Sequence, residues 1–335
     1  MRVYVTGGTG FVGSNVVKLY GDWHRLDVVA GGTRPPERPL PATFSRIELL
    51  DRDALRTAIV AAEPDVVVHA AILNDLSAIY ADRRLAWDSY VESTRTVADA
   101  ANEVGAILVY VSTDWVFDGT QAGADERTPT NPINLYGHLK AAAELVTLER
   151  AREPIVVRVA GVNGVHWARA EGPRAQDAGL GHYVAALVDA LSVGEPFIVW
   201  EGEDVNERGT PSLASESAEM MLGLVRAGAR GVFHCCGGES VTRMELARAA
   251  VDVFGLEADL LRSGPPPLEG MLPAPVPRDT SLDARATAEA IGYALPSVRE
   301  LLGAFRSQRE TGELRPLAAP ANHPLIKVAT RRAAR

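Results

Sequence analysis

Short apolar runs alternate with helical patterns through the first half of the chain. The runs are rich in Val, Ile and Leu without polar alternation, as expected of strands that are buried on both faces. They lie at Val3–Thr6, Asp27–Ala30, Ile47–Leu50, Val66–His69, Ile107–Ser112 and Ile155–Val159. From Ala86 to Val104 the apolar residues follow the 3.6-residue period of a helix. Repeated alternation of strand and helix predicts an α/β fold, namely a Rossmann-type doubly wound parallel sheet.

The pattern loosens after about residue 160. The stretch 161–181 is rich in Gly, Ala and Arg, which is typical of a long functional loop. We expect a dinucleotide-binding domain over 1–160, completed by segments within 178–235, and a smaller, interleaved C-terminal substrate lobe over 161–310. Residues 311–335 are basic and contain proline. This indicates a solvated or surface-packed tail, with a binding arm as the alternative.

Composition narrows the range of partners. The 335 residues are 47% apolar, enough for a sizeable core, and the net charge of -9 argues against nucleic acid as a partner. No apolar run approaches the roughly 20 residues that span a bilayer, and the N-terminus lacks the pattern of a signal peptide. We therefore expect a cytoplasmic protein without a membrane partner. Cys235 and Cys236 are adjacent and have no metal-ligand spacing, so we expect free thiols and no metal site.

A glycine-rich loop follows the first apolar run. Gly7, Gly10 and Gly13 are spaced three residues apart, between a predicted strand and a predicted helix. Glycine allows a tight turn and close approach of the backbone to a pyrophosphate, and the helix N-terminus offers free N–H groups. This context favours dinucleotide binding over a purely structural turn.

The residues after the second run bear on the choice of dinucleotide. They read Ala30-Gly31-Gly32-Thr33-Arg34, with no carboxylate to bind the 2′-hydroxyl of an NAD ribose. Arg34 is suited to a 2′-phosphate, which favours NADP(H) over NAD(H). The alternative is that Arg34 is a solvated loop residue.

Tyr136 and Lys140 are four residues apart in a helical pattern and therefore share one helix face. A phenol of pKa about 10 is poorly matched to proton transfer at neutral pH, and a nearby ammonium favours the phenolate. We expect Lys140 to lower the pKa of Tyr136 and to bond the cofactor ribose. Such pairs also arise by chance, but this one follows the fifth run, where a doubly wound sheet presents its ligand crevice. Thr113 comes directly after that run, at its carboxyl end, and offers a hydroxyl to polarise a carbonyl oxygen.

Together these motifs resemble the extended short-chain dehydrogenase/reductases, and among them the nucleotide-sugar ketoreductases such as the dTDP-4-dehydrorhamnose reductases. The resemblance spans residues 1 to about 305 and rests on the segments 6–13, 69–71, 112–119, 136–140, 208–211 and 279–282. It implies that Thr113, Tyr136 and Lys140 form the catalytic set.

The resemblance also implies binding residues. Asp51, expected at the end of the third strand, would accept a hydrogen bond from the adenine amino group. The implied contacts to the cofactor are made by Gly7, Gly10, Phe11, Val12, Gly13, Asp51, Ala70, Ala71, Tyr136 and Lys140, and Arg34 joins them as argued above. The candidates for the substrate are Trp115, Asn163, His166 and Arg208, although His166 is equally compatible with simple loop packing.

The implied activity is reduction of a keto group on a nucleotide-linked sugar, with Tyr136 as the proton donor. Related dehydratases place a Glu base after the Thr-Asp pair, whereas this chain has Trp115, whose indole cannot accept a proton. Two alternatives stay open: a sugar-nucleotide epimerase with tightly bound NAD, and a non-catalytic NADP-binding regulatory subunit resembling that of methionine adenosyltransferase. A homodimer is compatible with the sequence, which does not determine the oligomeric state.

Overall fold

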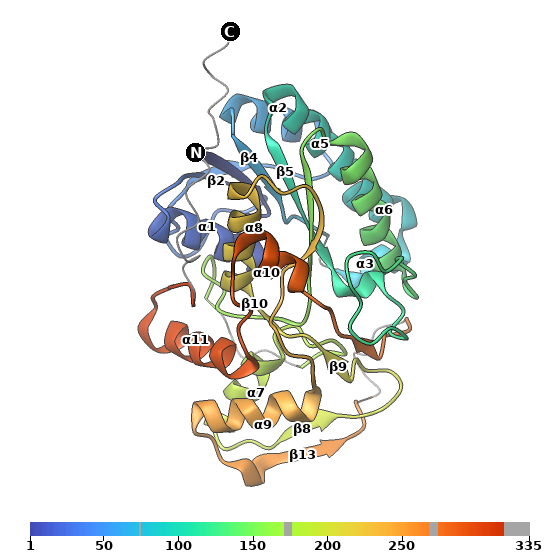
Figure 1. The fold of residues 1–335 in the computed structure, drawn as a ribbon, viewed down its shortest axis with the longest axis vertical. Coiled ribbons are helices and arrows are strands. Elements are labelled where there is room, and N and C mark those ends of the chain that lie inside the picture. The colour runs from blue at the N-terminus through green and yellow to red at the C-terminus, as the bar shows by residue number, and fades with distance from the viewer. Residues whose placement is uncertain (74, 171–175, 268–273, 318–335) are drawn as a thin grey trace.

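A seven-stranded sheet dominates one end of the molecule in the computed structural model, which describes residues 1–73, 75–170, 176–267 and 274–317 (Figure 1). All its neighbouring strands run parallel, in the order β11-β6-β5-β4-β1-β2-β3. The strands are β1 (Arg2–Thr6), β2 (Asp27–Gly32), β3 (Thr43–Arg46), β4 (Val66–His69), β5 (Ile107–Thr113), β6 (Pro154–Val159) and β11 (Gly231–His234). The predicted Rossmann-type doubly wound sheet is thereby confirmed.

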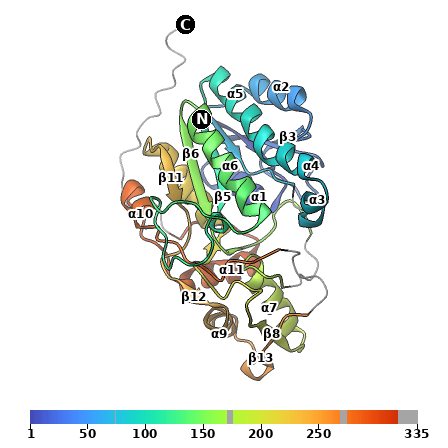
Figure 2. The same ribbon diagram turned by 90° about the vertical axis from the view of Figure 1, so that its right-hand side faces the viewer.

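Successive strand residues face different helix layers, because side chains alternate across a strand. Val3 and Val5 pack in the core with α1 and α8, whereas Tyr4 packs in the core with α2 and α5. Figure 2 shows α5 and α6 running side by side along the sheet. The bounds of these helices are α1 (Phe11–Lys18), α2 (Arg52–Ala62), α5 (Ser93–Val104), α6 (Leu135–Arg150) and α8 (Ala214–Arg226).

The prediction places the third strand at Ile47–Leu50, four residues too late, because β3 is formed by Thr43–Arg46. The structure pairs Thr43–Arg46 with β2, and after one more bond from Ile47 N to Gly32 O (3.0 Å) the chain turns away. Ile47 and Leu49 pack against the core beneath α2 and α5. Their apolar character therefore reflects burial, and strand pairing occurs in the more polar residues before them.

The chain leaves the sheet after β6 to begin a second core, returns to the sheet for α8 and β11, and then completes the second core. This second core lies at the end of the molecule opposite α2 and α5 (Figure 1). Its elements are α7 (Tyr183–Ser192), β8 (Phe197–Trp200), α9 (Arg243–Phe254), β13 (Leu261–Gly264) and α11 (Val298–Thr311). Short pieces connect the halves: β7 (Val162–Asn163), β9 (Arg208–Gly209), β10 (Ser212–Leu213), β12 (Val241–Thr242) and β14 (Asp279–Thr280). The remaining α-helices are α3 (Leu76–Ala81), α4 (Arg83–Trp87) and α10 (Arg285–Ile291).

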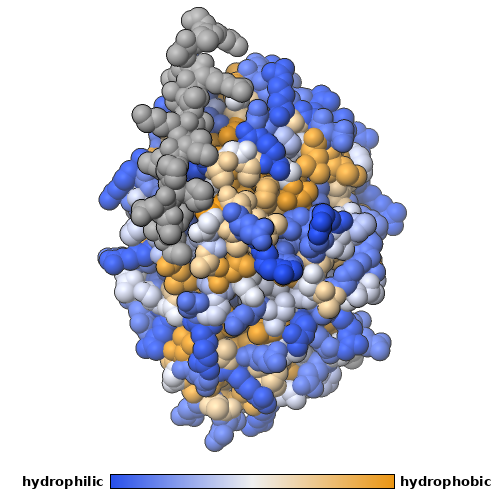
Figure 3. Space-filling model, in the orientation of Figure 1, coloured by the Kyte–Doolittle hydropathy of each residue, from blue (hydrophilic) through white to orange (hydrophobic). Residues whose placement is uncertain are grey.

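Hydrophilic side chains are spread over the face drawn in Figure 3, with smaller groups of apolar side chains between them. Across the described ranges, no helix combines the length and the apolar character that a bilayer crossing requires. Before the described chain ends, Leu317 N donates to the buried carboxylate of Glu216. Most of the predicted basic tail, residues 318–335, lies outside the described residues.

Candidate active site

A cleft of about 1000 Å³ lies along the carboxyl edge of the large sheet. One side is formed by residues that follow β1, β2, β4 and β5, and the other side includes residues of the segment 161–182. The predicted site residues that line it are Gly7, Gly10, Phe11, Val12, Gly13, Arg34, Ala70, Ala71, Thr113, Trp115, Tyr136, Lys140 and His166. Open α/β sheets bind ligands at this edge, so the cleft is the candidate active site.

The glycine turn forms one end of the cleft. Gly7 has a φ of +69°, and a Cβ there would lie 2.7 Å from Ala71 Cα. At Gly13 a Cβ would lie 2.1 Å from the carbonyl oxygen of Gly7, so only glycine permits α1 to start this close to β1. Gly10 caps α1 without a side chain, which leaves the first N–H groups of the helix directed toward the cleft end. This backbone cradle fits a pyrophosphate.

Thr113, Tyr136 and Lys140 meet where β5 and α6 come together. Asn134 caps α6 by accepting from Gly137 N (2.8 Å), and a Cβ at Gly137 would lie 2.2 Å from Trp115 O. This tight approach sets the first turn of α6 against the segment after β5. Thr113 lies close enough to Tyr136 to lower its pKa, and the Thr113 hydroxyl donates to Asp114 Oδ1 (3.0 Å). The three predicted side chains therefore share one wall of the cleft.

The acid–base properties of Tyr136 differ from the expectation. Burial raises the pKa of Tyr136 to about 12, with a smaller lowering by Thr113 and a further raising by the charge of Asp114. Lys140 does not produce the expected lowering, because its ammonium is turned to Val111 O (2.5 Å) and lies 4.4 Å from the centre of the Tyr110 ring. Burial also lowers the pKa of Lys140 to about 7, against an upward pull from Glu144.

Burial also shifts the pKa of two other titratable groups next to these residues. Desolvation raises the pKa of Asp114 to about 6, although hydrogen bonds from Thr280 and Thr113 oppose the shift. Burial, and then the charge of Lys140, lower the pKa of His69 to about 3, so its imidazole is neutral. His69 Nδ1 lies 2.6 Å from the Thr6 hydroxyl and serves the packing of β1 on β4.

Two predicted residues lie outside this arrangement. Asp51 does not end a strand: it caps α2 by accepting from Ala54 N (3.0 Å) and is not among the residues that line the cleft. Arg208 donates to Ser240 O (3.2 Å) and lies 3.7 Å from the carboxylate of Glu245, also away from the cleft lining. Both side chains thus satisfy local structure, and their predicted ligand contacts find no support in the geometry.

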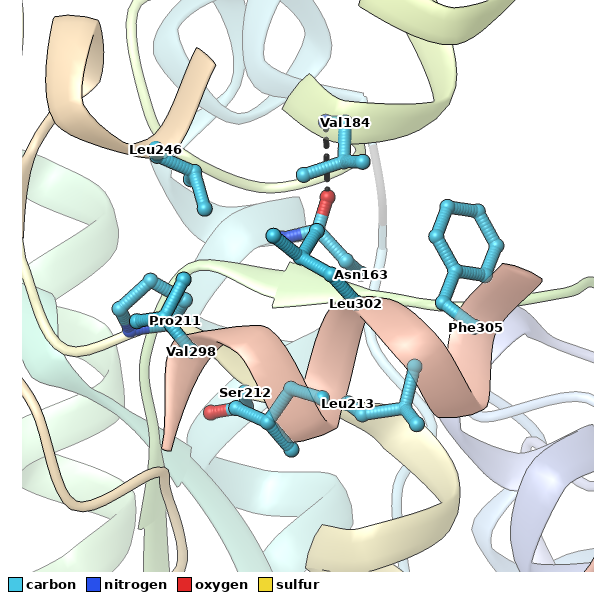
Figure 4. A pocket seen from close by; sticks show the side chains of 10 residues that line it. Asn163, Val184, Pro211, Ser212, Leu213, Leu246, Val298, Leu302 and Phe305 are labelled. Atoms are coloured by element: carbon cyan, nitrogen blue, oxygen red, sulfur yellow. Dashed lines mark hydrogen bonds between the residues drawn. The ribbon is translucent and has the colours of Figure 1, made fainter. Parts of the chain in front are cut away.

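Asn163 likewise has a structural position. Its Oδ1 accepts from Val184 N (2.9 Å) at the start of α7, and its Nδ2 donates to Gly161 O (2.8 Å). Figure 4 shows Asn163 in a small, largely apolar pocket beside α11, with its oxygen directed at Val184. Since both ends of the amide bind backbone, Asn163 anchors the loop after β6 and is not placed to bind substrate.

Comparison with known proteins identifies the family. The model described as the RmlD substrate binding domain matches residues 1–310. The chain belongs to the RmlD family. This confirms the resemblance to the dTDP-4-dehydrorhamnose reductases and their relatives that the motifs indicated.

Similar proteins differ in their activities. The dTDP-4-dehydrorhamnose reductase of Mycobacterium tuberculosis is 29% identical over 333 residues, covering 97% of this chain and 95% of that protein. Methionine adenosyltransferase 2 subunit beta of Bos taurus is 28% identical over 314 residues, covering 91% and 88%. A solved structure of dTDP-4-dehydrorhamnose reductase from Bacillus anthracis, in complex with NADP, superposes with a TM-score of 0.74 at 21% identity, covering 92% and 98%.

In this RmlD-family chain, Glu144 and Arg158 form a buried ion pair one helical turn after Lys140. Glu144, one turn after Lys140, accepts from Arg158 Nε (3.0 Å) and Nη2 (2.7 Å) and from the Ser112 hydroxyl (2.5 Å). The side chains of Glu144 and Arg158 are each 4% exposed. The pair joins α6 to β5 and β6, so it holds the helix that carries Tyr136 against the sheet.

Several cleft residues escaped prediction from the sequence. Asp177 and His182 line the wall contributed by the loop after β7, and the rings of His182 and Phe11 lie 4.1 Å apart. Arg169 lines the cleft from the same loop. Only the basic character of that loop signals Arg169, because spacing carries no information in irregular structure. Within the described ranges, no group of three or more His, Cys, Asp or Glu side chains could hold a metal ion.

Proposed function

We propose that this protein uses NAD(P)H to reduce a keto group on a nucleotide-linked sugar, with Tyr136 as the proton donor. The observation that carries the proposal is a single cleft with a phosphate-sized glycine cradle at one end and the Thr113–Tyr136 pair in its wall. Membership of the RmlD family supports the nucleotide-sugar class of substrate.

The residues of the chain suit the parts of this reaction. Gly7, Gly10 and Gly13 would hold the pyrophosphate, Ala70 and Ala71 would line the nicotinamide ribose, and the bound dinucleotide supplies hydride. Because burial raises its pKa to about 12, Tyr136 carries its proton at neutral pH and would donate it to the developing alkoxide, as a weaker acid than the sequence predicted. Thr113 would hydrogen-bond the same oxygen, and Lys140 would bond the cofactor ribose. Trp115 stands edge-on to Tyr136, with ring centres 6.0 Å apart, and offers no base for dehydration.

The choice between NADP(H) and NAD(H) depends on the charge of the residue that follows β2 at the cleft. Arg34 lies exposed at the cleft edge after β2, where an acid would serve NAD. We therefore propose NADP(H) as the preferred cofactor.

The test is a panel of nucleotide-linked keto sugars assayed for NADPH oxidation. Tyr136→Phe should bind NADP⁺ as the wild type does and lose about 10² to 10⁴ in rate, the usual contribution of a general acid. Tyr4→Phe removes a hydroxyl from a tyrosine outside the cleft lining and should keep its activity. Turnover by Tyr136→Phe at the wild-type rate would contradict the assigned role.

A second candidate is a non-catalytic regulatory subunit that binds the dinucleotide. It is favoured by the bovine relative, subunit beta of a methionine adenosyltransferase, which matches 91% of this chain. Under this candidate no keto sugar on the panel is reduced, and the protein co-elutes with a methionine adenosyltransferase catalytic subunit in gel filtration. Turnover without such a complex rules it out.

A further inference from the structure

The segment 165–170 is tied to the nucleotide-binding half by a series of hydrogen bonds. Asn15 Nδ2 donates to Val165 O (2.9 Å), and the Trp167 indole donates to Asn15 Oδ1 (3.0 Å). The Trp167 ring also lies under the ammonium of Lys18, 5.3 Å from its centre. The segment therefore packs on α1 although it follows β7, about 150 residues later.

The same segment then reaches the loop that follows β2. Ala168 O accepts from the backbone N–H groups of Glu37 (2.8 Å) and Arg38 (3.2 Å), and the Glu37 carboxylate accepts from Ala170 N (3.4 Å). Arg169 stands between these contacts. Its backbone is thus fixed beside the loop that carries Arg34.

Both Arg34 and Arg169 line the cleft. Among the described residues neither has an ion-pair partner, although many other arginines of this acidic chain, with net charge -9, are paired. The nearby carboxylate of Glu37 is engaged by Ala170 N. Two cations without an ion-pair partner that line one cleft attract an anion.

Resting on the proposed function, we infer that Arg169 is a second determinant of dinucleotide specificity and binds, together with Arg34, the phosphate on the 2′-oxygen of the adenosine ribose. The ribose of a bound dinucleotide lies at the end of the second strand, which is where the Ala168 contacts hold Arg169. Guanidinium groups suit phosphate because they donate two parallel hydrogen bonds. Specificity is thus completed by a loop from the second half of the chain.

The experiment measures binding by calorimetry, without turnover. NADP⁺ and NAD⁺ are titrated, and adenosine 2′,5′-bisphosphate and AMP serve as fragments that differ only in the 2′-phosphate. Arg169→Gln should weaken NADP⁺ and the bisphosphate about 10-fold, the value of one charge-assisted bond, and leave NAD⁺ and AMP unchanged. Arg34→Gln should act alike, and Arg169→Lys should keep most of the affinity. Arg38→Gln removes an equal charge from the same exposed loop outside the cleft lining, so its NADP⁺ affinity should equal that of the wild type.

Two results overturn the inference: equal affinity of Arg169→Gln and wild type for NADP⁺, or an equal loss for NAD⁺, which would assign Arg169 to the shared pyrophosphate. A melting temperature unchanged by the substitution shows that the variant is folded. If the 2′-phosphate effect is found but no keto sugar is reduced, the inference stands and the proposed function fails. If the wild type binds neither dinucleotide, both fail.

Discussion

The buried ion pair behind Lys140 allows a quantitative test of how α6 is held on the sheet. Glu144 accepts two bonds from the Arg158 guanidinium and one from Ser112, and both charged side chains are 4% exposed. Glu144→Gln keeps the size of the side chain and removes its charge, so Arg158 remains as a buried cation that water cannot reach. Breaking a buried pair from one side costs about 3–5 kcal/mol. We expect the free energy of unfolding to fall by that amount in urea titrations followed by circular dichroism.

The same helix supplies the control. Arg150 bonds Asp99 through Nε (2.6 Å) and Nη2 (2.9 Å), the same two-point geometry, but these side chains are 44% and 41% exposed. Asp99→Asn should cost about 0.2–1 kcal/mol, because water solvates the released guanidinium. The contrast between the two variants isolates burial from geometry.

A double variant separates charge from packing. Glu144→Leu with Arg158→Met removes both charges, so it should be more stable than Glu144→Gln, since neither desolvation penalty remains. Unfolding of Glu144→Gln within about 0.5 kcal/mol of the wild type, the range of an ordinary surface substitution, would refute the reasoning.

Three further predictions follow from other contacts. Gly13→Ala should lower stability by about 1–3 kcal/mol and abolish dinucleotide binding in calorimetry, because its Cβ would lie 2.1 Å from a carbonyl oxygen of the glycine turn. The control Gly303→Ala, which has open space around its Cβ, should change neither stability nor binding. The pKa of Lys140 is about 7 in the folded protein, against 10.5 for an ordinary lysine, so the unfolded chain binds more protons between these two pH values. The free energy of unfolding of the wild type should therefore rise with pH across this window, relative to that of Lys140→Met, in urea titrations. Arg243→Met removes the hydrogen bonds from the guanidinium to the carbonyls of residues 177–179, so the free energy of unfolding should fall by about 3 kcal/mol. Proteolysis within 176–182 should also become faster, and an unchanged cleavage rate would contradict the role of Arg243 in holding this loop.

Local patterns were sufficient for the sheet, the glycine turn and the Tyr136–Lys140 face. Each depends on residues close in sequence: buried runs for strands, three glycines for the turn, and a four-residue spacing for the helix face. Local patterns failed where the buried apolar residues are not the ones that pair with a neighbouring strand. At Ile47–Leu50 the apolar residues pack under helices, and β3 forms from the residues before them. Asp51 was misplaced for the same reason, since its position depended on that strand.

By itself, the sequence determined the fold class, the glycine turn and the identity of the residues beside it, because these arise from short-range backbone geometry and periodic burial. Only the tertiary structure decided the direction of the pKa shifts of Tyr136 and Lys140, the structural role of Asn163, and the contact between the segment 168–170 and the loop that carries Arg34. The reason is physical: desolvation and hydrogen bonding depend on neighbours that are distant along the chain, as when Ala168 O meets the amide of Glu37.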